Sequence, residues 1–184
     1  MSHRALYFVV IEALLVCLLS SQVYGWWMWT PGDTVDDSTQ NGLVAGYEPN
    51  QPIPFSHKVH AGDRQIACEY CHNGARRSAS AVIPSTELCM GCHKVVAVDK
   101  EPIKWLTEKY NKKEPIAWVR VHDLPHHVRF THQMHVIAGV SCESCHGPVK
   151  TMAKVGQWAP LQMGWCIGCH KENNASISCQ TCHY

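Results

Sequence analysis

The sequence predicts a mostly irregular fold with short α-helices, preceded by one N-terminal transmembrane helix. Three observations support this prediction. A Cys-x-x-Cys-His motif occurs five times, and an apolar stretch lies near the N-terminus. The chain has 184 residues, a length at which side chains build only a modest core. We therefore expect short helices after the motifs, joined by long connecting loops.

The five motifs carry the attachment signature of c-type haem. The two thiols of each motif would form thioethers with the porphyrin vinyl groups, and the following histidine would bind the iron through a neutral imidazole. The motif cysteines are Cys68, Cys71, Cys89, Cys92, Cys142, Cys145, Cys166, Cys169, Cys179 and Cys182, and the histidines are His72, His93, His146, His170 and His183. The sequence thus predicts five covalently bound c-type haems, which would also supply much of the apolar interior.

Zinc sites and disulfides also use pairs of cysteines, but neither requires a histidine directly after every pair. With 13 histidines in 184 residues, chance would rarely place one after all five pairs. The formal net charge of +1 says little about partners, because each haem would add two propionates. Nucleic-acid binding is not expected, since the chain contains no basic run.

Residues 1–29 are predicted to form a transmembrane anchor. Residues 5–19 are almost entirely apolar, and the tryptophans within 26–29 are typical of an interfacial aromatic belt. This segment is long enough to cross a hydrocarbon core of about 30 Å. Arg4 favours a cytoplasmic N-terminus, which predicts a single-pass protein of the inner (cytoplasmic) membrane with the remaining chain on the periplasmic face. A cleaved signal peptide is the alternative. If the helix is retained, we expect Glu12 to face another subunit, because a carboxylate facing lipid is costly.

Residues 30–52 are rich in turn-forming residues and predict a linker, and residues 53–184 form the predicted pentahaem domain. A repeat organises this domain. The pattern F-[ST]-H-x-x-H begins at Phe55 and again at Phe130, and each copy precedes two haem motifs. We therefore expect two dihaem modules plus a fifth haem at the C-terminus. Between the modules, apolar positions at helical spacing within 101–115 predict a short amphipathic helix.

Seven further histidines in the predicted domain can supply the sixth ligand of each iron. Imidazoles three residues apart project from nearly one side of a helical turn, so each repeat unit can serve two irons. His57 and His60 belong to the first unit, and His132 and His135 belong to the second. Which of these histidines pairs with which haem is left open by the sequence.

The fifth distal ligand is less well defined. His122, His126 and His127 are the candidates, and we favour His122 because a run rich in β-forming residues precedes it and Leu-Pro follows closely. Met163 is a further candidate, and an axial thioether would raise the potential of its haem. Packing is the more usual role for such a methionine.

The repeat units followed by Cys-x-x-Cys-His motifs resemble the multihaem cytochrome c3/c7 family. Several runs are similar in more detail to the pentahaem, membrane-anchored subunit of alternative complex III: Trp118-Val-Arg-Val-His122-Asp-Leu-Pro, Phe130-Thr-His132, Cys142-Glu-Ser-Cys-His-Gly147 and Met163-Gly-Trp-Cys166. The resemblance extends over essentially the whole chain from Pro52, with the doubled His126-His127 as a departure. It implies a quinol oxidoreductase in which polytopic membrane subunits, helped by an iron–sulfur subunit, oxidise quinol. The pentahaem subunit then passes electrons to a monohaem cytochrome or directly to an oxidase or soluble carrier.

The sequence therefore predicts an electron-transfer subunit, with haems arranged as a wire, and not an enzyme in its own right. A multihaem reductase would need an iron without a distal protein ligand, and the surplus of histidines argues against it. A free-standing, membrane-anchored quinol dehydrogenase is permitted by the topology. The haem count and the resemblance around His122 argue against that alternative, as does the inability of one helix to enclose a quinol ring.

Overall fold

The computed structural model describes residues 45–184. The chain divides into two units, residues 1–36 and 37–184, and the described residues belong to the second. The predicted anchor, 1–29, and residues 30–44 of the predicted linker lie outside the described residues. Among residues 45–184, no helix is both long enough and apolar enough to cross a membrane.

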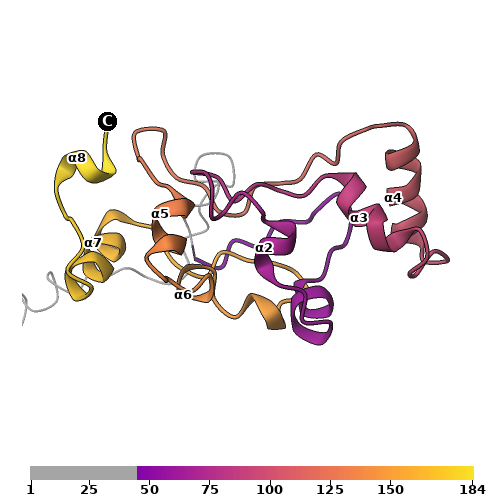
Figure 1. Ribbon diagram of the computed structural model, residues 1–184, viewed down its shortest axis with the longest axis horizontal. Coiled ribbons are helices and arrows are strands. Elements are labelled where there is room, and N and C mark those ends of the chain that lie inside the picture. Colours follow the sequence, from indigo (N-terminus) through magenta and orange to yellow (C-terminus); the bar gives the residue numbers. More distant parts are fainter. Residues whose placement is uncertain (1–44) are drawn as a thin grey trace, which may run out of the picture. The chain divides into compact units, whose positions relative to one another are not determined.

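Short helices joined by long loops make up the described part of the chain (Figure 1). Residues 45–184 contain no β-strand, and an isolated antiparallel bridge joins Val128 to His183. This confirms the predicted small, mostly irregular helical fold. The elements in order are the π-helix η2 (Lys58–Asp63), α2 (Cys68–Cys71), α3 (Thr86–His93), α4 (Glu101–Asn111), α5 (His132–Ile137), α6 (Glu143–His146), the 3₁₀ helix η3 (Val149–Thr151), α7 (Met163–Glu172) and α8 (Cys179–Cys182).

Each Cys-x-x-Cys pair lies on or at the edge of a helix, in α2, α3, α6, α7 and α8. A helical turn brings residues three apart to one face, so both thiols of a motif point toward the same neighbourhood. The predicted amphipathic helix is α4, which ends at Asn111 and not near Pro115. It stops early because Lys113 adopts a left-handed backbone conformation, with φ of 57°.

The apolar core formed by side chains is small. Only six hydrophobic residues within 45–184 are buried, and three of them, Ile53, Met90 and Leu106, form one cluster. Trp105 and Trp118 pack against this cluster, which joins α4 to the helix of the second haem motif, α3. Side chains alone therefore bury little apolar surface in this domain. This agrees with the expectation that haems supply much of the apolar interior.

Residues 45–52, expected as the end of the linker, are hydrogen-bonded to the haem domain. The amide of Gln51 donates to the carbonyl of Val119 at 2.9 Å and accepts from the backbone N–H of the same residue at 2.9 Å. The backbone N–H of Gly46 donates to the carbonyl of Gln157 at 2.6 Å. These contacts tie residues 46–51 to the segment between the modules and to the second module.

Candidate haem-binding sites

Each of the five motif histidines faces an imidazole whose ring centre is 5.6 to 6.4 Å from its own. The ring centres are 6.4 Å apart for His57 and His72, 6.1 Å for His60 and His93, 6.2 Å for His132 and His146, 6.1 Å for His135 and His170, and 5.6 Å for His127 and His183. An iron bound between two imidazoles separates the ring centres by about 6 Å. Each metal–nitrogen bond is about 2 Å long, and each ring centre lies about 1 Å beyond its nitrogen. The five pairs therefore fit five irons that each have two imidazole ligands.

Backbone carbonyls orient four of the motif imidazoles through the nitrogen Nδ1. His72 donates from Nδ1 to the carbonyl of Val82 at 2.7 Å, His93 to Val96 at 3.1 Å, His170 to Ser176 at 2.6 Å and His183 to His127 at 3.2 Å. A hydrogen bond at Nδ1 fixes the tautomer and leaves Nε2 free to bind a metal. The loops after three of these motifs, and residue 127 in the case of His183, thus hold the rings in the form that ligation requires.

The two repeat units have nearly the same internal geometry. Phe55 lies edge-on to His57 with ring centres 4.9 Å apart and an interplanar angle of 85°, and Phe130 lies edge-on to His132 with the same two values. The later histidine of each unit also donates from Nδ1 to a nearby carbonyl, at 2.9 Å in both units. The first histidine of each unit faces one motif histidine and the second faces the next, an arrangement that the sequence left open.

Burial favours the neutral form of two imidazoles, His57 in the first module and His146 in the second. Burial is the largest cause that lowers the pKa of His57 to about 4, and the neighbouring His72 and His60 lower the pKa further. Burial and nearby histidines likewise lower the pKa of His146 to about 4. A neutral imidazole is the form that binds iron, so these sites disfavour the proton that would compete with the metal.

His122, which we favoured as the fifth distal ligand, is not the imidazole that faces the remaining motif histidine, His183. Nε2 of His122 lies 3.3 Å from Nδ1 of His146, and the two rings are nearly perpendicular, at 79° with centres 4.4 Å apart. The ring that faces His183 belongs to His127. His126 is exposed, and the Met163 side chain, at the start of α7, is 64% exposed.

Pairing between the C-terminus and residues 127–129 explains the position of His127. Val128 and His183 form the isolated bridge, and the backbone N–H of Arg129 donates to the carbonyl of Cys182 at 2.7 Å. Arg129 also lies over the ring of Tyr184, 4.6 Å from its centre. No local pattern in the sequence predicts this contact, because His127 and His183 are 56 residues apart.

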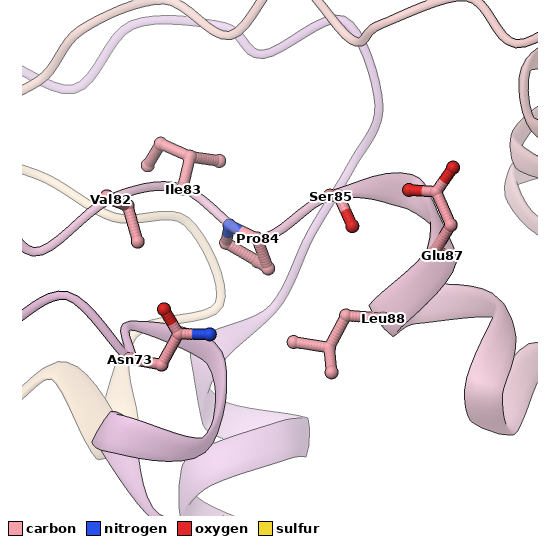
Figure 2. Close-up of a pocket in the computed structure, with 7 residues that line it drawn as sticks. All are labelled: Asn73, Val82, Ile83, Pro84, Ser85, Glu87 and Leu88. Carbon is pink, nitrogen blue, oxygen red and sulfur yellow. The ribbon is translucent and has the colours of Figure 1, made fainter.

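A cavity of about 500 Å³ adjoins the first motif (Figure 2). Its lining is mixed, with Val82, Ile83, Pro84 and Leu88 beside the polar residues Asn73, Ser85 and Glu87. The carbonyl of Val82 accepts the hydrogen bond from His72, so the cavity lies beside an anchored motif imidazole.

Within residues 45–184, no three or more histidine, cysteine, aspartate or glutamate side chains lie together as metal ligands would. The ten motif cysteines are all unpaired thiols in the described part of the chain. They are therefore free to form thioethers.

The short helices, the five Cys-x-x-Cys-His motifs and the opposed imidazoles define a protein like the multihaem cytochromes c. Residues 128–184 match the family model of cytochrome c7 and related cytochrome c. The chain is also similar to the multihaem cytochrome c subunit of menaquinone reductase from Nitratidesulfovibrio vulgaris. That protein is 27% identical over 195 residues, which cover 91% of this chain and 87% of the relative. These similarities imply covalently bound c-type haems.

Proposed function

We propose that this chain is an electron-transfer subunit of a membrane-bound quinol oxidoreductase complex and that it carries electrons through five c-type haems. The observation that carries the proposal is the opposition of every motif histidine to a second imidazole at 5.6 to 6.4 Å. Haem iron with two imidazole ligands has no open position for a substrate and suits one-electron transfer. The name of the menaquinone reductase relative supports a link to quinones.

The proposed ligands follow from the same pairs. The motif cysteines would hold the haems, and the proposed axial pairs are His57 with His72, His60 with His93, His132 with His146, His135 with His170 and His127 with His183. We thus propose His127, and not the favoured candidate His122, as the fifth distal ligand. The remaining histidine of the trio, His126, would then have no role in ligation.

We further propose that the five motifs form one continuous path in which the second motif, and not the first, stands at one end. Four motif thiols have a pKa that is raised mainly by burial and further by a nearby thiol of another motif. The four pairs, each with the affected thiol first, are Cys71 and Cys92, Cys142 and Cys68, Cys145 and Cys169, and Cys166 and Cys182. These neighbours support the order second, first, third, fourth, fifth. Figure 1 shows the motif helices in the same succession, α3, α2, α6, α7 and α8.

This order gives the path two ends, at α3 and at α8. Electrons would enter near one end from quinol-oxidising membrane subunits, with an iron–sulfur subunit, and leave near the other for a monohaem cytochrome or an oxidase. The similarity to the pentahaem subunit of alternative complex III supports such partners, and the relative from a menaquinone reductase supports a membrane complex. We propose that residues 1–29 anchor the chain in the cytoplasmic membrane and that the haem domain lies on its outer face.

The division of labour can be tested with the full-length chain, purified alone and reconstituted in lipid. We expect a small reductant to reduce its haems, whereas added quinol does not until the other membrane subunits are present, because one helix cannot enclose a quinol. Absorbance of the reduced haems would be followed in time. Rapid reduction of the isolated chain by quinol, lost on replacing Glu12 or the tryptophans within 26–29, would instead establish a free-standing quinol dehydrogenase.

A further inference from the structure

One motif histidine is held differently from the other four. His72, His93, His170 and His183 donate from Nδ1 to backbone carbonyls. Nδ1 of His146 instead lies 3.3 Å from the side-chain nitrogen Nε2 of His122. The difference lies in the second module, although the pairs Phe55–His57 and Phe130–His132 have the same ring geometry.

The chain after His146 accounts for the missing carbonyl. In the first module, the loop after His72 returns and presents the carbonyl of Val82. In the second module, His146 is followed by Gly147 with φ of 68°, and the ring of Trp158 packs against the glycine where a Cβ would stand. Only glycine fits this close approach, and the chain leaves in another direction. His122 fills the place that a carbonyl has in the first module.

The position of His122 is built into the fold. The preceding residue, Val121, is buried with 8% exposure. The following residue, Asp123, pairs with Arg120 at 2.7 Å and accepts a hydrogen bond from the backbone N–H of Leu124 at 3.1 Å. The segment that carries His122 is therefore fixed on both sides of the imidazole.

The protons of the two rings follow from ligation. If Nε2 of His146 binds iron, its Nδ1 carries the proton and donates it, so Nε2 of His122 is the acceptor. An imidazole nitrogen is a stronger base than an amide carbonyl. It draws the shared proton further from His146 and makes that ring a more electron-rich ligand. Such a ligand stabilises ferric iron over ferrous iron and lowers the reduction potential.

We propose that His122 is a positioning residue for the third haem site: it orients His146 and makes the reduction potential of that site lower than a carbonyl acceptor would. The hydrogen bond also holds the His146 ring within 8° of the plane of His132. The inference rests on the proposed function, because it takes Cys142, Cys145 and His146 as the attachment site of the third haem.

Two substitutions separate the acceptor from the shape of the side chain. His122→Phe keeps a ring but removes the acceptor, and His122→Gln supplies an amide oxygen like that of a backbone carbonyl. His126→Phe is the matched control, because His126 is exposed and close in sequence. The holoprotein variants would be titrated with reductant while the low-spin ferric signals are followed by electron paramagnetic resonance.

We expect His122→Phe to move one of the five midpoint potentials upward and to alter one low-spin signal, with no high-spin iron. His122→Gln should give a smaller upward shift, and His126→Phe should match the unmodified protein. Unchanged potentials in His122→Phe would overturn the inference. A high-spin haem in that variant would also overturn it, since His122 would then be an axial ligand. Peptide mapping that finds no haem on Cys142 and Cys145 would instead overturn the proposed function at this site.

Discussion

At the scale of single residues, the two kinds of axial histidine differ in how far the sequence determines them. The motif histidines and the repeat units are local patterns, and the structure brings their imidazoles together in pairs. The partner of His183 could not be predicted in this way. His127 reaches it because the C-terminus pairs with residues 127–129, a long-range contact that has no local signature.

Substitution of the histidine trio tests the fifth ligand. His127→Ala should convert one low-spin ferric haem to a high-spin or water-ligated form, because the ring opposite His183 is removed. His126→Ala is the control: His126 is exposed like His127 but is not the ring that faces His183, so the spectra should stay unchanged. Absorption spectra of the ferric protein and carbon monoxide binding to the reduced protein would report the change. A silent His127→Ala would show that another residue completes this site.

Ring planes give a second prediction at this scale. The imidazole planes differ by only 8°, 11° and 21° in the pairs of His146, His72 and His183, but by 46° and 61° in those of His170 and His93. Parallel rings act on the same iron orbital and separate the orbital energies, whereas strongly crossed rings leave them closer together. We therefore expect two classes of low-spin ferric signal in electron paramagnetic resonance, in a ratio of three haems to two.

A single class of signal in the fully oxidised protein would contradict that assignment of ring planes. Power saturation and simulation of the spectrum would give the number of haems in each class. The variant His60→Ala, which removes the most strongly crossed pair, should diminish the minority class and leave the majority class intact.

At the scale of elements, the sequence predicted α4 well and its end less well. Apolar spacing located the helix, but the left-handed conformation of Lys113 ends it before Pro115. Helix ends depend on backbone conformations that apolar periodicity does not encode. The short helices contain the thiol pairs, whereas the sequence led us to expect helices after them. The contact of α4 with α3 is a tertiary feature.

The contact between α4 and α3 should stabilise the second haem site. Leu106 is 4% exposed within the cluster that includes Met90, so Leu106→Ala should lower the free energy of unfolding by about 2 to 5 kcal/mol. Val95→Ala is the control, because Val95 is 81% exposed and should cost little. Chemical denaturation of the holoprotein would compare the variants. Equal stability of the two would show that α4 contributes little to the fold.

At the scale of the whole molecule, the order of the motifs in space differs from their order in the sequence. The repeat predicted dihaem modules, but it could not predict that the second motif stands at one end of the path. That order depends on which thiols of different motifs lie together, such as Cys68 with Cys142. It follows from the packing of the two modules and not from either module alone.

The order predicts which variants interrupt transfer along the path. Loss of the ligand His132 affects a central site, and loss of His60 affects the site at the α3 end. In the intact complex, His132→Ala should slow passage between the two ends. His60→Ala should disturb only exchange with the partner at α3. Rapid-mixing absorbance would compare haem reduction by each partner. Equal effects of the two variants on exchange with both partners would contradict the proposed order.

The central claim is that each of the five motifs holds one haem between two imidazoles. Intact mass of the denatured holoprotein combined with a pyridine haemochrome assay tests it most directly, because covalent haem stays with the chain and is counted per polypeptide. We predict five haems per chain, with entirely low-spin ferric spectra and no carbon monoxide binding in the native protein. Fewer than five haems with zinc on the remaining cysteines, or a substantial high-spin signal from undamaged protein, would contradict the account.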